Sequence, residues 1–443
     1  MTFSKGNTFL LAALLFSACL YGCMNNDVDD KTIEPSVETD KPVETNETTK
    51  TEELEKYIST IQAIDIPDDV EVIGLGEATH GNVELQELKR DVFEALINNE
   101  NVRVFVLEGD FGAGQQINQF ILNDIGSAKE VVYALDYNIY KTEQMIDLVQ
   151  WMHDYNLTAS DNEKIYFYGN DMQRYDDSKQ GLLDYYEVVN IEAAKTYAEQ
   201  LKHVSNATMR DLTPEQYEEM NEVIEQIILD LQSNEKVYSE QSSPDAFAFA
   251  LQYAHVLKQR TQLFLNESNY TQLRDQYLAD NLQWIVEFEA ERGHDKVLIT
   301  AHNGHIEQSS ASLAGYKSMG NYLDERFGPA YFAIGTDLIK SEFQALNSQS
   351  GEREIHTLEN HNDLVDAFRE MDSNIFYIDF ENASKSEELA EILTKKQRMM
   401  NIGDDFASWY KLTKSFYTIE MIPNEAYDGV IIVKEATPTS VLE

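Results

Sequence analysis

Short apolar runs alternate with long amphipathic stretches from residue 54 to near the end of the chain. The runs are rich in Val, Ile and aromatic residues and end in glycine or polar residues, which favours strands over buried fragments of helix. Several are continuously apolar, as expected for strands that are covered on both faces. The alternation predicts an α/β fold with a mostly parallel sheet layered by helices. The predicted strands span residues 72–76, 102–108, 164–169, 297–301, 331–335, 375–380 and 430–433.

Residues 182–293 interrupt this alternation, because they contain no strand pattern. Apolar residues recur at spacings of three and four in 216–231 and 245–263, which indicates amphipathic helices. Thr213 and Ser243 each precede a proline, so each offers a capping hydroxyl just before the first turn of a helix. The sequence therefore predicts a long helical insertion that returns the chain to the sheet and forms a lid or wall over a site.

The first residues are typical of a secretion signal, because Lys5 precedes an apolar run at 9–20 that is too short to span a bilayer comfortably. The tetrapeptide L-Y-G-C that ends at Cys23 resembles a lipobox, in which a lipid is attached to the thiol. Residues 1–23 are therefore predicted to be a signal peptide with lipidation at Cys23. An ordinary cleaved signal with an incidental cysteine is the alternative, and Cys19 is a weaker candidate for the lipid.

Residues 24–53 consist mainly of Asp, Glu, Thr, Lys and Pro and have too few large apolar residues to order themselves. They are predicted to form a disordered acidic tether, which would hold an exported, lipid-anchored protein on the extracytoplasmic face of the cell membrane. Both cysteines of the chain precede this tether, so the folded body, residues 54–435, has no thiol nucleophile, disulfide or cysteine metal site. Residues 436–443 are left as a short tail.

The chain is strongly acidic, with 79 Asp and Glu against 34 Lys and Arg and a formal net charge of -45. Such a charge repels phosphate backbones and anionic lipid surfaces, which excludes nucleic acid as a partner. Most of these carboxylates are expected to form a solvated surface. The sequence does not specify an oligomeric state.

The first predicted strand runs into a glycine-rich turn, G-E-A-T-H-G at 76–81, which a helical pattern follows. Ligands of parallel α/β sheets bind beyond the carboxyl ends of the strands, where Glu77 and His80 would lie. Glu77 stands three residues before His80 and can orient or charge-stabilise its imidazole. The turn lacks the Lys-Ser/Thr of a P-loop, so it gives only weak support to a phosphate site.

Two further predicted strands end in the same kinds of residue. One ends at Glu108, and another is followed by His302 and His305, so three of the nine histidines stand at strand ends together with two glutamates. This clustering favours a site, although each residue alone could equally cap a helix or bond the backbone. Asp171 and Asp337 also end strands and could simply cap the helices that follow.

An arginine could complete the set. Arg90 lies ten residues beyond His80, nearly three helical turns away on the same side, where it could pair with one of the two site glutamates and keep it ionised. A surface arginine bonded to a helix carboxylate is the plain alternative. Arg274, which precedes Asp275 in the insertion, presents the same choice.

Three chemistries could use these residues. Glu-x-x-His and His-x-x-His could coordinate zinc or another divalent ion, but the H-E-x-x-H helix of zinc proteases is absent. A nucleophilic serine is poorly supported because the chain has no G-x-S-x-G elbow. Attack by a water that a histidine deprotonates, with a second histidine or an arginine stabilising the oxyanion, remains, and it requires no cofactor.

The motifs also stand in a specific order. G-E-A-T-H-G at 76–81, V-L-E-G-D at 106–110, R-D-x-x-L-A-D-N at 274–281 and A-H-N-G-H at 301–305 are followed by Y-D-G-V near the end. In order and spacing they resemble the motifs of the erythromycin esterase family, and the resemblance covers nearly all of 54–435. It implies a three-layer α/β/α core with a parallel sheet and helical insertions, and a metal-independent opening of a macrolide lactone.

The same resemblance implies that His80 is the general base. The supporting residues of the family would fall on Glu77, Arg90, Glu108, His302 and His305. Asn82 stands where Thr is expected, and Tyr140-Lys141 replaces a Trp-Arg pair, which bears on the substrate more than on water activation. Many members of the family have unknown substrates, and some are called polysaccharide biosynthesis proteins.

The sequence thus predicts an enzyme that hydrolyses a small-molecule ester or lactone, a macrolide among the candidates. A metal-dependent hydrolase built on the same residues is one alternative. A non-catalytic surface protein that binds a tetrapyrrole or a glycan is another. Metal analysis of the purified protein would test the first alternative, and spectroscopy for a bound chromophore would test the second.

Overall fold

The computed structural model describes residues 53–311 and 315–442. The predicted signal peptide, the lipidation site Cys23 and residues 24–52 of the predicted tether lie outside the described residues. A search of the described helices finds none with the length and apolar character that crossing a bilayer requires.

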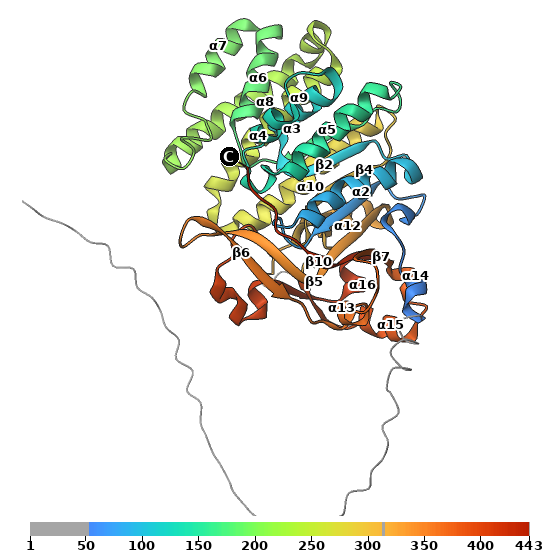
Figure 1. The fold of residues 1–443 in the computed structure, drawn as a ribbon. Helices are drawn as coiled ribbons and strands as arrows, with labels where there is room; N and C mark the ends of the chain where they lie inside the picture. The colour runs from blue at the N-terminus through green and yellow to red at the C-terminus, as the bar shows by residue number, and fades with distance from the viewer. Residues whose placement is uncertain (1–52, 312–314, 443) are drawn as a thin grey trace, which may run out of the picture. The chain divides into compact units, whose positions relative to one another are not determined.

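An eight-stranded sheet organises the fold, in the order β3-β2-β4-β1-β5-β10-β7, with β6 paired to β5 off this path (Figure 1). The neighbours from β3 to β10 are parallel, whereas β7 runs antiparallel to β10 and β6 antiparallel to β5. The strands are β1 (Val72–Glu77), β2 (Val104–Asp110), β3 (Tyr166–Asp171), β4 (Val297–His302), β5 (Tyr331–Asn347), β6 (Glu352–Glu359), β7 (Ile375–Asp379) and β10 (Gly429–Ala436). A separate antiparallel pair consists of β8 (Gln397–Met400) and β9 (Thr418–Met421).

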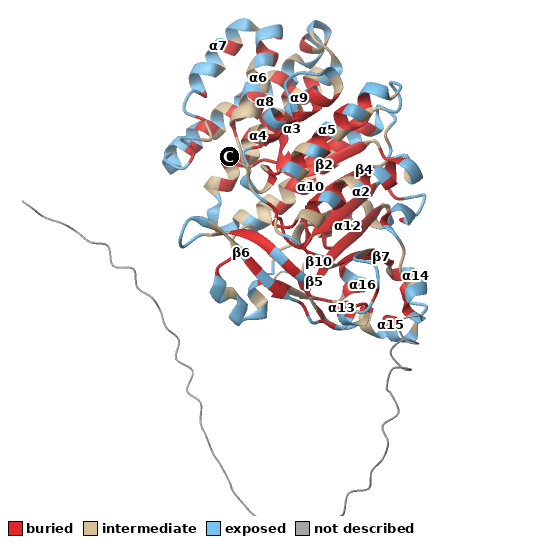
Figure 2. Ribbon diagram, viewed as in Figure 1, coloured by how far each residue is buried: buried red, intermediate tan, exposed pale blue. Residues whose placement is uncertain are grey.

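Alternate residues of the central strands point into two different apolar cores. Ile73 and Leu75 of β1 belong to one core, which α2 (Val83–Glu100), α4 (Ala128–Ala134) and α5 (Glu143–Thr158) complete. Val72 of β1 and Val106 of β2 belong to the other, which α10 (Tyr270–Ala290) and α12 (Met319–Phe327) complete. Successive side chains of a strand point to opposite faces, so helices cover the sheet on both sides. The predicted three-layer α/β/α fold is confirmed, and Figure 2 shows the strands buried between their helices.

The helical insertion has a core of its own, which includes Leu182, Ile224 and Leu257. Its helices are α6 (Asp176–Val189), α7 (Ile191–Gln200), α8 (Pro214–Gln241), α9 (Pro244–Leu265) and α10. The predicted starts of α8 and α9 are correct, because the Thr213 and Ser243 hydroxyls accept hydrogen bonds from the backbone of the first turn. The remaining helices are α3 (Phe111–Asn123), α11 (Asn303–Ile306), α13 (Asp363–Ala367), α14 (Phe380–Ala383), α15 (Glu387–Leu393) and α16 (Pro423–Ala426).

The structure differs from the predicted strands mainly around β5. This strand continues twelve residues past the predicted end at Gly335, to Asn347, and pairs there with β6, which the apolar pattern does not reveal. Exposed residues alternate with buried ones at 339–343 of β5 and at 355–359 of β6, as they do in strands with only one covered face. The short strands β8 and β9 are also absent from the prediction.

Residues beyond β10, which the sequence leaves as a tail, lie against the turn that follows β1. The backbone N–H of Thr439 donates to the carbonyl of Gly81 at 2.9 Å, and that of Val83 donates to the carbonyl of Thr437 at 2.9 Å. A Cβ at Gly81 would lie 2.0 Å from the carbonyl oxygen of Gln344, so only glycine fits between β5 and this strap. The turn that carries His80 is therefore held from two sides.

Candidate active site

Five predicted site residues converge at the carboxyl edge of the sheet. Glu77 ends β1, Glu108 lies near the end of β2, and His302 ends β4. The parallel register places Glu77 directly beside His302, and β2 pairs with the other side of β4. His80 follows in the turn after β1, and His305 lies in the single turn of α11 after β4. Their convergence is a consequence of three adjacent parallel strands that all end in titratable residues.

Glu77 lies between His80 and a buried lysine. His80 Nδ1 donates to Glu77 Oε1 at 2.6 Å, and the Nζ of Lys89 on α2 donates to Glu77 Oε2. Burial alone would raise the pKa of Glu77, but Lys89 and His80 outweigh it and hold this pKa at about 2. Burial alone would lower the pKa of His80, but the Glu77 carboxylate raises it above 6.5. His80 is therefore a strengthened base whose Nδ1 is fixed and whose other ring nitrogen, Nε2, is left for substrate or water.

His302 is held in the opposite state. Its Nε2–H donates to the backbone carbonyl of Ile402 at 3.0 Å, which leaves Nδ1 unprotonated. Burial, and then the nearby His80, lower the pKa of His302 to about 3, so its imidazole is neutral at neutral pH. The two rings lie 5.2 Å apart between centroids. The His80 imidazole therefore takes up a second proton readily, whereas the neutral His302 imidazole can accept a hydrogen bond at Nδ1.

Glu108 is held by a largely buried arginine from the insertion. Arg274 Nη2 donates to Glu108 Oε1 at 2.7 Å and to Asp171 Oδ2, at the end of β3, at 2.6 Å. The backbone N–H of His302 donates to Glu108 Oε2 at 3.0 Å. Burial would raise the pKa of Glu108, but His305 and Arg274 hold it well below 4.5. The Glu108 carboxylate therefore connects β2 to β4 and to α10, and Arg274 extends the connection to β3 through Asp171.

His305 is a largely buried cation. Its Nδ1 donates to Asp275 Oδ1 at 2.7 Å, and its Nε2 lies 3.3 Å from Glu108 Oε1. Burial would lower the pKa of His305, but Asp275 and Glu108 raise it to about 10. The site consequently combines one neutral imidazole, one imidazolium and the Arg274 guanidinium around two ionised glutamates.

Comparison with known proteins identifies the fold and the family. The erythromycin esterase family model matches residues 97–436, which is most of the chain. The chain belongs to the erythromycin esterase family. It is 24% identical to the erythromycin esterase type II of Escherichia coli over 293 residues, which is 60% of this chain and 68% of that protein. The family relationship suggests an esterase, and the region matched begins after the turn that carries Glu77 and His80.

Solved structures show the same fold. A Bacillus cereus protein superimposes with a TM-score of 0.76 at 21% identity, covering 90% of this chain and all of the other. A succinoglycan biosynthesis protein gives a TM-score of 0.74 at 21% identity, over 90% of this chain and 99% of the other. A mutant of the erythromycin esterase EreC in an open conformation gives 0.62 at 15% identity, over 85% and 93%.

The arginine that the family resemblance places in the site lies elsewhere. The guanidinium of Arg90 lies over the ring of Trp151, 5.2 Å from its centroid. The ion pairs with the two site glutamates that were expected of Arg90 are made by other residues. Lys89 pairs with Glu77, and Arg274 pairs with Glu108. The helical phase explains the difference. Lys89 shares the buried face of α2 with Leu85, four positions away, whereas Arg90 is turned about 100° from Lys89. The apolar periodicity of α2 could therefore have predicted that Lys89, and not Arg90, faces the sheet.

Two lesser candidates from the sequence have structural partners. Asp171 pairs with Arg274, as described above. Asp337 accepts hydrogen bonds from Asn360 and Asn362 and from the backbone N–H of Met400, so it connects β5 to the segments beside it. Burial raises the pKa of Asp337 to about 6.

Among the described residues, no three His, Cys, Asp or Glu side chains are grouped so that they could hold a metal ion. Each imidazole has one nitrogen engaged, since His80 Nδ1 bonds Glu77, His302 Nε2 bonds a carbonyl, and His305 Nδ1 bonds Asp275. Arg274, which bonds Glu108, has a buried Nε–H donor without a hydrogen-bond partner. The free groups of this edge therefore suit an anionic oxygen and a water.

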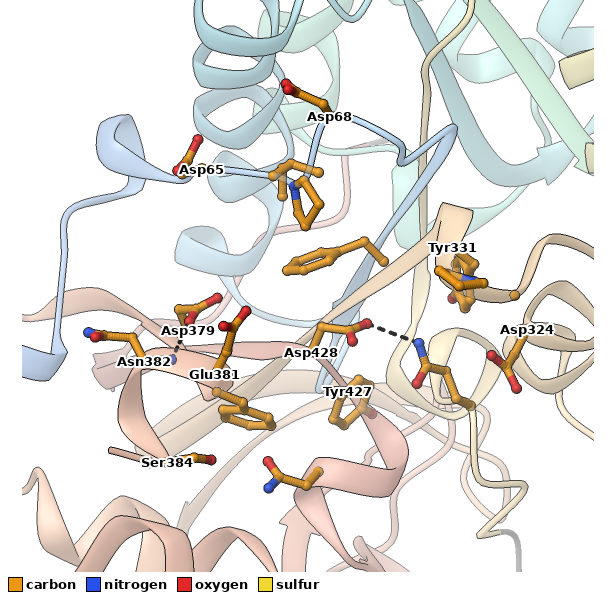
Figure 3. A pocket seen from close by; sticks show the side chains of 18 of the residues that line it. Asp65, Asp68, Asp324, Tyr331, Asp379, Glu381, Asn382, Ser384, Tyr427 and Asp428 are labelled. Atoms are coloured by element: carbon orange, nitrogen blue, oxygen red, sulfur yellow. Dashed lines mark hydrogen bonds between the residues drawn. The ribbon is translucent and has the colours of Figure 1, made fainter. Parts of the chain in front are cut away.

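The site lies at the opposite edge of the sheet from a cavity of about 1030 Å³ (Figure 3). That cavity lies at the amino ends of β5 and β10 and is lined by the carboxylates of Asp65, Asp68, Asp324, Asp379, Glu381 and Asp428. Burial, together with the nearby Asp324 and Asp379, raises the pKa of Asp428. None of the six predicted site residues lines this cavity.

Asp110, at the end of β2, gives a prediction about stability. Its Oδ1 caps α3 by accepting from the N–H of Ala113 at 2.7 Å, while its buried Oδ2 has no partner. Burial raises the pKa of Asp110 to about 8. The folded protein therefore holds a proton that the unfolded chain has lost above about pH 4, so stability falls as pH rises from about 4 to about 8.

Asp110→Asn should remove this dependence, because the amide keeps the cap and cannot ionise. Between about pH 5 and pH 8 the unmodified protein should lose on the order of 3 kcal/mol that the variant retains. Urea unfolding at the two pH values measures the difference. Asp379→Asn, which replaces a half-buried capping aspartate at the end of β7, is the matched control and should show a smaller change. Equal pH dependence in the Asp110 variant and the unmodified protein would contradict the prediction.

Proposed function

We propose that this protein hydrolyses an ester or lactone bond with a water that His80 activates. The observation that carries the proposal is the buried Glu77–His80 pair, in which the 2.6 Å contact fixes Nδ1 and raises the pKa of the ring. A base oriented in this way, with its second nitrogen free, is what proton abstraction from water requires. Family membership supports an ester or lactone as the substrate.

The proposed reaction proceeds in two stages. His80 Nε2 takes a proton from water while the water oxygen bonds to the carbonyl carbon, which gives a tetrahedral oxyanion. The intermediate then breaks its bond to the leaving oxygen, and the His80 imidazolium returns the proton to that alkoxide. Glu77 stabilises the imidazolium between these stages, and Lys89 keeps Glu77 ionised.

The protonation states divide the other roles. His302 is neutral, and its Nδ1 can only accept, so it is suited to hold the second hydrogen of the water. The oxyanion needs donors, which His305 and Arg274 supply as cations held by Asp275, Glu108 and Asp171. Positive charge fixed beforehand in a buried site stabilises a developing anion more strongly than it would in water.

Mass spectrometry tests the reaction class directly. The purified protein is incubated with a panel of macrolides and simpler esters, with and without a chelator, and the products are searched for the gain of one water. Hydrolysis that is unchanged by the chelator supports the proposal. Hydrolysis that disappears with the chelator and returns with a metal would replace it with metal-dependent chemistry. Failure to hydrolyse any ester of the panel would remove the proposal and favour a binding protein.

The pKa of His80 predicts the pH dependence of the rate. The base is active only when it is neutral, and Glu77 raises its pKa, so kcat/KM should fall on the acidic side with a midpoint above 6.5. Glu77→Gln removes the carboxylate and should move this midpoint downward while it lowers the rate. A profile of log kcat/KM against pH measures both. An acidic midpoint at or below 6.5 in the unmodified protein would contradict the assignment.

We also propose that the chain is exported and anchored through a lipid on Cys23. The support is the sequence alone, namely the apolar run before L-Y-G-C and the acidic segment after it. Metabolic labelling with a fatty acid should mark the unmodified protein and not Cys23→Ser. Labelling of both proteins, or of neither, would overturn this assignment.

A further inference from the structure

Residues 401–417 form a loop between β8 and β9 whose two ends lie side by side. The N–H of Asn401 donates to the carbonyl of Tyr417 at 2.9 Å, which closes the neck of the loop. Its outer part contains two single 3-10 turns, η6 (Ser408–Leu412) and η7 (Lys414–Phe416). A compact surface loop with adjacent ends is frequently functional. We call residues 401–417 the aromatic loop.

The aromatic loop turns large apolar side chains outward. Trp409 is 45% exposed, Leu412 85% and Phe416 47%. Trp409 contacts the ring of Phe416 at 5.0 Å and that of Tyr410 at 4.6 Å, so the exposed rings form one patch. Scattered single apolar residues are normal on a surface, whereas three within eight residues on one loop mark an interaction site.

These side chains are not the loop's own core. Phe406 performs that function, because it is fully buried and contacts Phe343 at 5.1 Å and His356 at 4.8 Å between ring centroids. The hydroxyl of Tyr410 also bonds Asp405 at 2.9 Å. The loop is therefore anchored on β5 and β6 by other residues, and its outer rings are left for a partner.

The charge of the loop differs from that of the protein. The chain carries a net charge of -45, yet residues 406–417 contain Lys411 and Lys414 and no acidic residue. The two aspartates at the start of the loop are engaged, Asp404 with Arg353 at 2.7 Å and Asp405 with Tyr410. Lysines beside Trp, Tyr, Phe and Leu are the composition of protein segments that lie at a bilayer interface, with rings among the headgroups and ammonium groups on lipid phosphates.

We propose that the aromatic loop docks on the surface of an anionic lipid bilayer through Trp409, Leu412 and Phe416, with Lys411 and Lys414 contacting the headgroups. Because like charges repel, docking through the loop would require the strongly acidic remainder of the protein to face away from the lipid. The proposal depends neither on Cys23 nor on the hydrolysis proposed above.

Docking would also fix the place of the site relative to the membrane. The neck residue Ile402 donates its N–H to the carbonyl of Ala78 at 2.7 Å and accepts from His302 Nε2 at 3.0 Å. The loop thus begins on the two strand ends that carry the candidate catalytic groups. A loop seated on lipid therefore holds this edge of the sheet near the interface, where amphipathic substrates accumulate.

The fluorescence of Trp409 tests the proposal. The full chain with Cys23→Ser is mixed with phosphatidylcholine–phosphatidylglycerol vesicles that carry brominated acyl chains, and the emission of a matched Trp409→Phe protein is subtracted. Bromine quenches only a ring inserted among the lipids, so the signal separates docking by the loop from attachment through the N-terminal apolar run. Trp409 emission should shift to the blue and be quenched.

Variants supply the controls. Leu412→Ser with Phe416→Ser should raise the lipid concentration needed for half-maximal quenching on the order of tenfold or more. Leu229→Ser removes a leucine on α8 that is 61% exposed and should change nothing. Lys411→Glu with Lys414→Glu should weaken quenching with mixed vesicles and have little effect with pure phosphatidylcholine.

Two results would overturn the proposal. One is Trp409 emission that stays unquenched at saturating lipid, whether or not the protein sediments with the vesicles. The other is a blue shift that depends on protein concentration without lipid, which would assign the patch to contact between two copies of the chain.

Discussion

Replacement of His80 by Asn should lower kcat by about a thousandfold on any ester that the protein hydrolyses, the usual scale for loss of a general base. The asparagine amide can still donate to Glu77, so the carboxylate keeps both of its partners and the fold should change little. What is lost is the nitrogen that accepts a proton from water. Steady-state kinetics and thermal unfolding of the same preparation measure the two effects separately.

A second histidine provides the matched control. His153 on α5 is also buried, and its ring stacks on Phe120. It bonds Asp124 and Asp154, and neither of these is a candidate site residue. His153→Asn should leave kcat within about twofold of the unmodified value, because the effect of a base is confined to the reacting atoms. Full activity in the His80 variant would remove the central assignment of the mechanism.

Arg274→Met should lower the free energy of unfolding by about 3–5 kcal/mol, since removing one partner of a buried ion pair leaves the other charge uncompensated. Arg274 bonds both Glu108 and Asp171, and burial penalises each carboxylate once the guanidinium is gone. The methionine fills much of the same volume, so the loss reports charge rather than packing. Urea unfolding gives the value, and the same variant should hydrolyse esters more slowly.

Arg326→Met tests whether burial is the cause. Arg326 on α12 also pairs with an aspartate, Asp280, but the pair is partly exposed to solvent. Exposed pairs contribute about 1 kcal/mol or less, so this variant should be far less destabilised. Similar losses in the two variants would show that the buried network is not specially important for stability.

The parallel strands could be predicted because each is a continuous apolar run between polar or glycine residues. The hairpin of β5 and β6 could not, since exposed residues such as Lys340 and Thr357 alternate with buried ones and interrupt the apolar run. The direction of β7 is also invisible in its apolar run. It is set by pairing with β10, a contact between distant parts of the chain.

The candidate site was predictable where its residues end strands. Glu77, Glu108 and His302 converge because adjacent parallel strands end together, and no knowledge of the helices is needed. The cations of the site come from helices, and a helix offers several basic residues. The phase of α2 distinguishes Lys89 from Arg90, but the placement of Arg274 depends on how the insertion packs, which the sequence does not encode locally.

Residues 437–439, which lie across the turn after β1, make the activity depend on the last part of the chain to be synthesised. Glu84, in the first turn of α2, accepts from the backbone of Thr437, 353 residues later. Contacts of such sequence separation form late, after the cost of closing a long loop has been met. The turn that carries His80 is therefore braced only after residues 437–439 are in place, and a chain emerging from the ribosome should become competent only when these last residues have been delivered.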